Sequence, residues 1–195
     1  EMCIRDSILL DALLALRTEI KSMLSHDVPS SDAMPPFTPM SLWMKATSMA
    51  LADFPILNAS ILPEPDGALY LHYHACHHIG FAMDSPQGLI VPVIKNVETK
   101  SLLTLASELA MLITKGKEGT LNKENLTGGT FTLSNIGAIG SGVSAIPILL
   151  VPQVCIGALC KIQRKLVLTT AQKGQGVEST ELQTALPGLM DNESV

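Results

Sequence analysis

Apolar residues recur at helical spacing in three segments of the chain. Residues 8–24 carry leucines and isoleucines every three or four positions with charged residues between them, which predicts an amphipathic helix. Residues 40–52 are mostly apolar and predict a largely buried helix that ends before Pro55, because proline disfavours helix in the residue that precedes it. Residues 102–113 predict a third helix, which is followed by the sequence KGKEG.

Short apolar or alternating segments predict β-strands between and after these helices. An apolar run ends at the turn cluster PEPDG, and the segment after it alternates. Two later segments flank DSPQG, which is typical of a hairpin. The predicted strands are residues 56–61, 68–74, 79–83, 89–94, 130–134, 154–159 and 166–169, with a helical turn at 123–126.

Helices and strands follow one another in mixed order, and the links between strands are hairpin-like. This favours a largely antiparallel or mixed sheet covered by helices on one face over a regular βαβ array. Residues 25–36 are polar and rich in turn residues, which predicts a loop. The first seven residues, EMCIRDS, fit nothing downstream and resemble the translation of a sequencing-library adapter, so we expect residues 1–7 to lie outside the domain.

Composition narrows the possible functions. The chain has 195 residues, of which 47% are hydrophobic and 16% charged, enough for one domain with a sizeable core. The net charge is −5 and no basic block occurs, so we expect no nucleic-acid partner. No apolar run approaches the ~20 residues that cross a bilayer, so we expect no membrane partner. None of the four cysteines forms Cys-x-x-Cys, and Cys155 and Cys160 lie in apolar sequence, which indicates inert reduced thiols.

Residues 127–142, TGGTFTLSNIGAIGSG, combine a β-branched run with many glycines. The glycine order differs from the Gly-x-Gly-x-x-Gly of dinucleotide-binding loops, and the sequence VSAIP that follows is a poor helix start. No Gly-Lys-Ser or Gly-Lys-Thr of a phosphate-binding loop is present either. We therefore interpret the segment as a strand followed by a permissive connection.

The sequence HYHACHH at residues 72–78 raises the alternative of a metal-binding domain. On a strand, every second residue lies on the same face, and imidazole and thiolate are ligands that zinc prefers. The side chains on that face would be His72, His74, Cys76 and His78. No second cluster supplies further ligands and no His-Glu-x-x-His occurs, so we expect no metal, and the cluster remains an alternative.

Five segments, in the same order, resemble the catalytic domain of the 2-oxoacid dehydrogenase dihydrolipoamide acyltransferases. The resemblance extends over residues 8–162, and the FPILNAS, AMDSPQGLIVP and TGGTFTLSNIG sequences are most similar to the branched-chain members, with pyruvate and 2-oxoglutarate members next. The segments are LRTEIK (16–21), DFPILNAS (53–60), HHIGFAMDSPQGLIVPVIKNV (77–97), LTGGTFTLSNIGAIG (126–140) and PQVCIGAL (152–159).

The resemblance implies an α/β fold of the chloramphenicol-acetyltransferase type, a two-layer sandwich with a mixed sheet and helices on one face. It also implies homotrimers that assemble into a larger multimeric core, in complex with decarboxylase and dihydrolipoamide dehydrogenase components. Coenzyme A (CoA) and a lipoyl-lysine arm, carried on a separate lipoyl domain, would enter a channel between two subunits. The implied location is the mitochondrial matrix, or the cytoplasm of a bacterium.

The reaction implied is transfer of a branched acyl group from lipoyl-lysine to the thiol of CoA. Such a transfer needs a general base for the thiol proton and a donor for the tetrahedral oxyanion. By resemblance the donor is Ser134, in the TLSN segment. The residues that match CoA-binding positions of the family are Arg17, Thr38, Asp84, Ser134 and Asn135.

The sequence departs from the family in one functional motif. The family's general base is the histidine of a His-x-x-x-Asp-Gly motif, which this chain does not contain. We therefore expect residues 8–195 to form part of an acyltransferase catalytic domain that alone is weakly active or inactive. A second hypothesis is a non-catalytic trimer scaffold that lacks the base.

Overall fold

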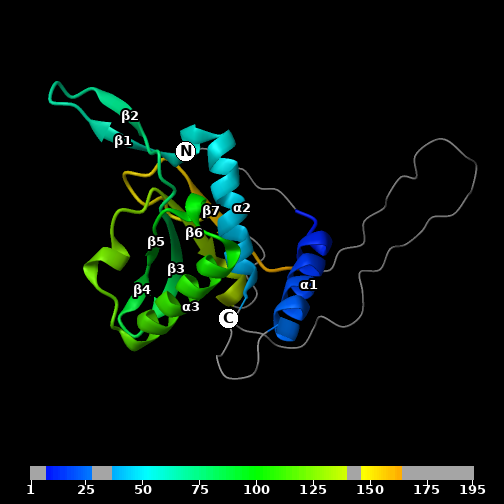
Figure 1. The fold of residues 1–195 in the computed structure, drawn as a ribbon. Coiled ribbons are helices and arrows are strands. Elements are labelled where there is room, and N and C mark those ends of the chain that lie inside the picture. Colours follow the sequence, from blue (N-terminus) through cyan, green and yellow to red (C-terminus); the bar gives the residue numbers. More distant parts are fainter. Residues whose placement is uncertain (1–7, 28–36, 140–145, 164–195) are drawn as a thin grey trace, which may run out of the picture.

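Helices and a mixed β-sheet form two layers in the computed structural model (Figure 1). The structure describes residues 8–27, 37–139 and 146–163; the N-terminal residues 1–7 lie outside them. The helices are α1 (Asp11–Asp27), α2 (Pro39–Asp53) and α3 (Leu102–Glu118). The strands are β1 (Ala59–Pro63), β2 (Leu69–Tyr73), β3 (Ile79–Ser85), β4 (Gly88–Ile90), β5 (Val93–Ile94), β6 (Phe131–Asn135) and β7 (Ile156–Leu159).

The three helices predicted from the apolar spacing are confirmed, although two of them end later than expected. Helix α1 continues to Asp27, so only residues 28–36 of the expected loop remain, and these lie outside the described part of the chain. Helix α3 continues to Glu118 and ends at Gly119, whose φ of 70° is left-handed. Glycine takes this conformation without the steric cost that a β-carbon brings, so Gly119 ends the helix.

The larger sheet has the strand order β4-β3-β6-β7, and β5 also pairs with β3. Strands β3, β6 and β7 run parallel to one another, whereas β4 and β5 pair with β3 in the antiparallel sense. The expected mixed sheet is therefore confirmed, and β6 lies at its centre with a hydrogen-bonded neighbour on each side.

Two of the predicted strands differ from the structure. Residues 55–58 form a 3₁₀ turn and the strand begins only at Ala59. Proline fixes φ near the helical value and lacks an N–H, so Pro55 starts a turn and not a strand. The expected strand 89–94 is two short strands on either side of Val91–Pro92, and the expected strand 166–169 lies outside the described residues.

Strand alternation divides β6 between the two faces of the sheet. Phe131 and Leu133 are buried in the apolar core with residues of α2 and α3, such as Met44 and Leu109. Because successive side chains on a strand point to opposite faces, the residues between and after them point away from the helices. One face of β6 thus packs in the core, and the other face carries Thr132 and Ser134.

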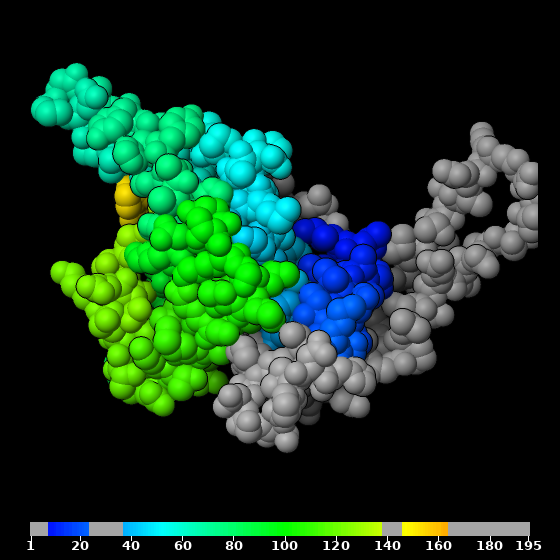
Figure 2. Space-filling model, viewed as in Figure 1, coloured from blue at the N-terminus to red at the C-terminus, as the bar shows by residue number. Residues whose placement is uncertain are grey.

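Strands β1 and β2 form a separate antiparallel hairpin that projects from the body of the molecule (Figures 1 and 2). Every residue of β2 is exposed. A two-stranded hairpin has little independent stability in water, so its base must be held by the body of the protein. The 3₁₀ turn and the 150–153 segment provide these contacts, for example from Ile61 N–H to the carbonyl of Pro152 at 2.9 Å.

Within the described ranges, no helix is both long and apolar enough to span a bilayer.

Lys45 of α2 holds the turn that precedes α3. Its ammonium donates to the carbonyl oxygens of Val97, Glu98 and Lys100 at 3.2, 3.0 and 2.8 Å. These carbonyls lie in and directly after a short 3₁₀ turn, Val97–Thr99, where the Val97 carbonyl also accepts a hydrogen bond from Lys100 N–H at 3.2 Å. One cation thereby joins two segments that lie far apart in the sequence.

Lys45→Met keeps the aliphatic length of the side chain and removes all three hydrogen bonds. We expect the free energy of unfolding to fall by about 1.5 to 3 kcal/mol, the range for hydrogen bonds to a charged group. Urea unfolding measures the change. The matched control is Lys117→Met on the exposed side of α3, which should shift stability by less than about 0.5 kcal/mol. Equal effects of the two substitutions would contradict this role of Lys45.

Candidate active site

Ser134 lies near the end of β6, on the face of the sheet opposite the helices. It pairs with Ala82 of β3 and with Ala158 of β7, both parallel, so the strand is held from both sides. Its immediate neighbours on that face are therefore methyl groups, which leave room beside the hydroxyl. Ser134 is half-buried, and its hydroxyl has no hydrogen-bond partner among the described residues. Ser134 is therefore a hydrogen-bond donor on a strand that is held on both sides.

The backbone after β6 turns at once into a short 3₁₀ turn, Ile136–Ile139. A β-carbon on Gly137 would lie 2.8 Å from backbone atoms of Cys160 and Lys161, so this glycine permits close contact between two chain segments. At Gly137, the connection that the sequence analysis interprets as permissive is therefore a close contact between two segments. A turn of four residues also offers no helix N-terminus for a phosphate.

Two other predicted site residues lie beside Ser134 on the sheet. Asn135 follows it on β6, with its side chain on the opposite face of the strand, and pairs with Leu159. Asp84 is exposed on β3, two residues beyond the partner of Ser134. One of its carboxylate oxygens accepts a hydrogen bond from Ser85 N–H at 3.0 Å. These residues form one group at the same end of the sheet.

Arg17 and Thr38 form a second group where α1 meets the start of α2. Arg17 Nε donates to the carbonyl of Phe37 at 3.3 Å, directly before Thr38. Thr38 occupies the N-cap position of α2, yet its side chain does not cap the helix. Its hydroxyl oxygen is buried and has no hydrogen-bond partner in the described part of the chain. No hydrogen bond among the described residues joins this group to the Ser134 group.

The histidine-rich sequence does not form the face expected for a metal site. Strand β2 ends at Tyr73, so the strand alternation that would align all four side chains stops after His72. His77 instead points into the interior, where its Nδ1 is 2.8 Å from Ser48 Oγ. Within residues 8–27, 37–139 and 146–163, no three His, Cys, Asp or Glu side chains are grouped closely enough to hold a metal ion.

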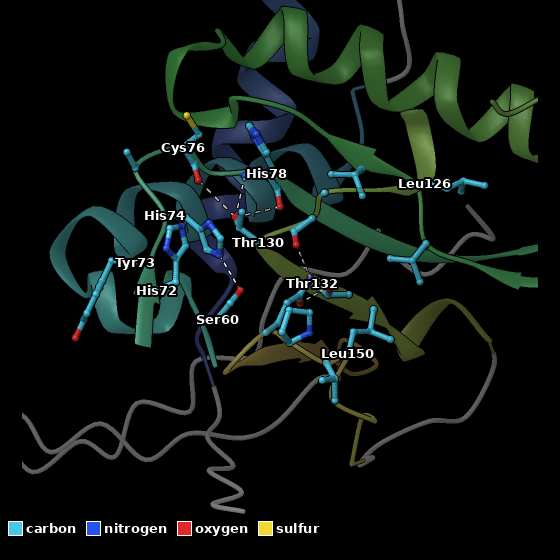
Figure 3. Close-up of a pocket in the computed structure, with 18 residues that line it drawn as sticks. Ser60, His72, Tyr73, His74, Cys76, His78, Leu126, Thr130, Thr132 and Leu150 are labelled. Atoms are coloured by element: carbon cyan, nitrogen blue, oxygen red, sulfur yellow. Dashed lines mark hydrogen bonds between the residues drawn. The ribbon is translucent and has the colours of Figure 1, made fainter. Parts of the chain in front are cut away.

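His72, His74 and His78 line a groove of about 800 Å³ between the hairpin, β6 and the 150–153 segment (Figure 3). His74 Nε2 is 2.7 Å from Ser60 Oγ, and the ring centroids of His72 and His74 are 4.8 Å apart. Burial, followed by the charges of His72 and His78, lowers the pKa of His74 below its usual value. Burial and then the charge of Lys95 lower the pKa of His78.

The described cysteines behave as the sequence indicated. Burial raises the pKa of Cys155, which lies partly buried beside the core. A raised pKa keeps the thiol protonated at neutral pH and so suppresses its reactivity. Cys76, Cys155 and Cys160 are all free thiols.

Comparison with known proteins assigns a family to this fold and site. The family model described as 2-oxoacid dehydrogenases acyltransferase (catalytic domain) matches residues 1–184. The chain therefore belongs to the 2-oxoacid dehydrogenase acyltransferase family. It is 44% identical over 158 residues to the mitochondrial lipoamide acyltransferase component of the branched-chain alpha-keto acid dehydrogenase complex of Bos taurus, and 45% identical over 159 residues to that of Mus musculus. Each match covers 81% of this chain and 31% of the relative, so the chain spans about a third of the length of these relatives.

Solved structures agree with this assignment. The cubic core of the pyruvate dehydrogenase multienzyme complex matches with a TM-score of 0.71 and 36% identity, over 81% of this chain and 61% of that one. A second solved structure, of Azotobacter vinelandii dihydrolipoamide acetyltransferase, matches with the same TM-score, identity and coverage. It is described as part of a study of the roles of a serine, a histidine and an asparagine in the catalytic mechanism of that enzyme. The expected chloramphenicol-acetyltransferase-like α/β fold, with helices on one face of a mixed sheet, is confirmed.

The groove leads to a prediction about pH. Because His72 contributes to the low pKa of His74, His72→Gln should raise the pKa of His74 part of the way back to its usual value of 6.5. NMR titration of the imidazole protons measures this change. The pKa of His78 provides an internal control and should not move, since His72 is not among the charges that shift it.

The same shift has a consequence for stability, with a definite sign. The pKa of His74 is lower in the folded chain than in the unfolded chain, so the unfolded chain binds protons more readily. The contribution of neutral His74 to stability is therefore complete above about pH 6.5 and is lost as the pH falls toward its folded pKa. A His74 pKa at or above 6.5 would contradict this description of the groove.

Proposed function

We propose that the protein containing this chain transfers a branched acyl group from lipoyl-lysine to the thiol of CoA, and that Ser134 stabilises the oxyanion of that transfer. The observation that carries the proposal is the Ser134 hydroxyl, which has no hydrogen-bond partner among the described residues and lies on a strand between Ala82 and Ala158. A donor that is fixed before the reaction costs no reorganisation when charge develops, which makes it effective in the transition state.

The chemistry assigns a clear task to this hydroxyl. The CoA thiolate attacks the carbonyl carbon of the acyl-dihydrolipoyl thioester, so a new C–S bond forms and the carbonyl oxygen becomes an oxyanion. Ser134 donates a hydrogen bond to that oxygen. When the intermediate collapses, the old C–S bond breaks and the dihydrolipoyl sulfur leaves with the electron pair and takes up a proton.

The general base is not among the residues that this sequence supplies. The family resemblance assigns it to the histidine of His-x-x-x-Asp-Gly, and none of the five histidines here lies in such a motif. For the Azotobacter vinelandii acetyltransferase, the catalytic mechanism is described through a serine, a histidine and an asparagine. This supports a mechanism that needs both an oxyanion donor and a general base. General-base assistance is typically worth ~10²–10⁴-fold, so we propose that the chain without this histidine is weakly active or inactive.

We propose CoA-binding roles for Arg17, Thr38, Asp84 and Asn135, in addition to Ser134. The guanidinium of Arg17 suits a phosphate, and it bonds to the carbonyl of Phe37, next in sequence to Thr38, whose buried hydroxyl has no partner among the described residues. Buried polar atoms in folded proteins are nearly always hydrogen-bonded, so the orphaned Thr38 oxygen calls for a ligand. Asp84 and Asn135 flank the reacting end of the sheet.

We assign the acyl group and the partners from the relatives. Several of the most similar curated relatives carry the branched-chain name and are mitochondrial, which supports a branched acyl group and a mitochondrial matrix location. Succinyltransferase and acetyltransferase components of bacterial 2-oxoglutarate and pyruvate complexes also match, and they leave those acyl groups, and a bacterial cytoplasm, as the alternative. We propose a homotrimer within a larger core, served by a separate lipoyl domain and by decarboxylase and dihydrolipoamide dehydrogenase components. No metal is proposed.

Ser134→Ala, made in the full-length protein, tests the proposed role of the hydroxyl. We expect kcat for acyl transfer from S-isobutyryl-dihydrolipoamide to CoA to fall by about 10²–10³-fold, because loss of one oxyanion donor acts in the transition state. The KM for CoA should change little, since the interaction is absent from the ground state.

The matched control is Ser107→Ala, which removes an exposed helix hydroxyl that bonds only to the carbonyl of Leu103. It should leave kcat unchanged. An undiminished kcat in Ser134→Ala would remove Ser134 from the mechanism. Complete absence of transfer in the wild-type full-length protein would instead favour the trimer scaffold.

Thr38→Val tests the CoA-binding group, because the change should stabilise the free protein and at the same time weaken CoA binding. Replacement of a buried, unpaired hydroxyl by a methyl group should raise the free energy of unfolding of the free protein by about 1 kcal/mol. The same change should raise the KM for CoA while kcat stays the same. Thr38→Ser, which keeps the hydroxyl, should retain the wild-type KM; a KM unaffected by Thr38→Val would exclude Thr38 from the CoA site.

A further inference from the structure

Thr132 of β6, two residues before Ser134, forms a buried hydrogen-bonded pair with Gln153. Thr132 Oγ1 donates to Oε1 of Gln153 at 2.9 Å, and the amide nitrogen of Gln153 donates to the carbonyl of Gly129 at 3.1 Å. Thr132 and Gln153 are 1% and 7% exposed. The two polar ends of the glutamine side chain thereby bond to β6 and to the loop before it.

Gln153 is itself fixed to the base of the β1–β2 hairpin. Its backbone forms an isolated antiparallel bridge with Ser60. The residues on either side of it bond to the same strand, from Ile61 N–H to the Pro152 carbonyl at 2.9 Å and from Val154 N–H to the Ala59 carbonyl at 3.2 Å. The side chain of Gln153 therefore couples β6 to a strand outside the main sheet.

The surroundings of Thr132 leave its side chain little freedom. A β-carbon on Gly80, its partner on β3, would lie 2.9 Å from Val91 Cγ1 and 3.4 Å from the Thr132 hydroxyl. The space beside Thr132 on β3 is thus already filled, and its hydroxyl has one described partner, Gln153. Movement of Thr132 would break that bond and leave a buried acceptor unpaired, which is costly.

Thr132 and Ser134 lie on the same face of β6, about 6.6 Å apart along the strand. Ser134 has no side-chain partner among the described residues, so the position of its hydroxyl depends on the strand alone. We infer that Gln153 is a positioning residue for acyl transfer. By holding Thr132 from outside the sheet, it fixes the position of β6 so that the Ser134 hydroxyl reaches the oxyanion. This inference rests on the proposed function of Ser134.

The test is a double-mutant cycle in the full-length protein, with S-isobutyryl-dihydrolipoamide and CoA as substrates. Thr132→Val keeps the shape of the side chain and removes its hydroxyl, and Gln153→Met removes the amide at similar length. Each is measured alone and together with Ser134→Ala. A misplacement of about 1 Å can cost on the order of 10²-fold in rate, so we expect roughly a tenfold loss of kcat from each, at unchanged KM for either substrate.

Two further variants distinguish positioning from general damage. Thr132→Ser keeps the hydroxyl and should restore most of kcat. Thr120→Val removes an exposed hydroxyl that makes a 3.4 Å bond to Lys115 and should have no effect. In the Ser134→Ala background, neither Thr132→Val nor Gln153→Met should lower kcat further, because the group they position is already gone.

Equal losses with and without Ser134 would overturn the inference, as would an unchanged kcat in Thr132→Val and Gln153→Met, or a loss that Thr132→Ser fails to restore. These outcomes differ from failure of the proposed function, in which Ser134→Ala itself retains full kcat. The combinations of Thr132→Val or Gln153→Met with Ser134→Ala therefore separate an incorrect role for Ser134 from an incorrect role for Gln153.

Discussion

The parallel pairing of β6 between β3 and β7 is the constraint on which the rest of the structure depends. It fixes the alternation of a five-residue strand, so that Phe131 and Leu133 enter the core while Thr132 and Ser134 face away from the helices. A slip of one residue would bury the serine and expose both apolar side chains. The same apolar contacts that stabilise the two layers therefore also determine which face of β6 carries Thr132 and Ser134.

The candidate site is built on both layers of the fold. The sheet supplies a rigid donor, and the α1–α2 junction supplies a guanidinium and an orphaned hydroxyl. Rigid placement matters because an oxyanion donor acts only if it already occupies the right position when charge develops. The hairpin and the 150–153 segment contribute from outside the sheet, through a glutamine whose two polar ends are both engaged with β6 and the loop before it.

Much of this could be predicted from local sequence. Apolar spacing predicted the three described helices, and the TFTLS alternation predicted β6. In a strand, this alternation places Thr132 and Ser134 on the same face. Pro55 overrode the apolar run after it, so a strand predicted from residue 56 begins as a turn. The alternative of a metal site at residues 72–78 assumed that the whole segment is a strand. Strand β2 ends at Tyr73, so the four side chains do not share one strand face. Gln153 could not be found from any pattern, because its partners lie 21 and 24 residues away in sequence and meet only in the fold.

A crystal structure of the full-length protein with CoA bound would test the central claim, that acyl transfer takes place at Ser134, on the face of β6 opposite the helices. The account predicts that the CoA thiol lies on this face, close enough that the oxygen of a thioester formed there is within about 3.2 Å of Ser134 Oγ. It also predicts that phosphates of the same molecule reach Arg17 and that a polar CoA atom pairs with the hydroxyl of Thr38. A CoA thiol on the helix side of the sheet, or in the histidine-lined groove away from Ser134, would contradict it.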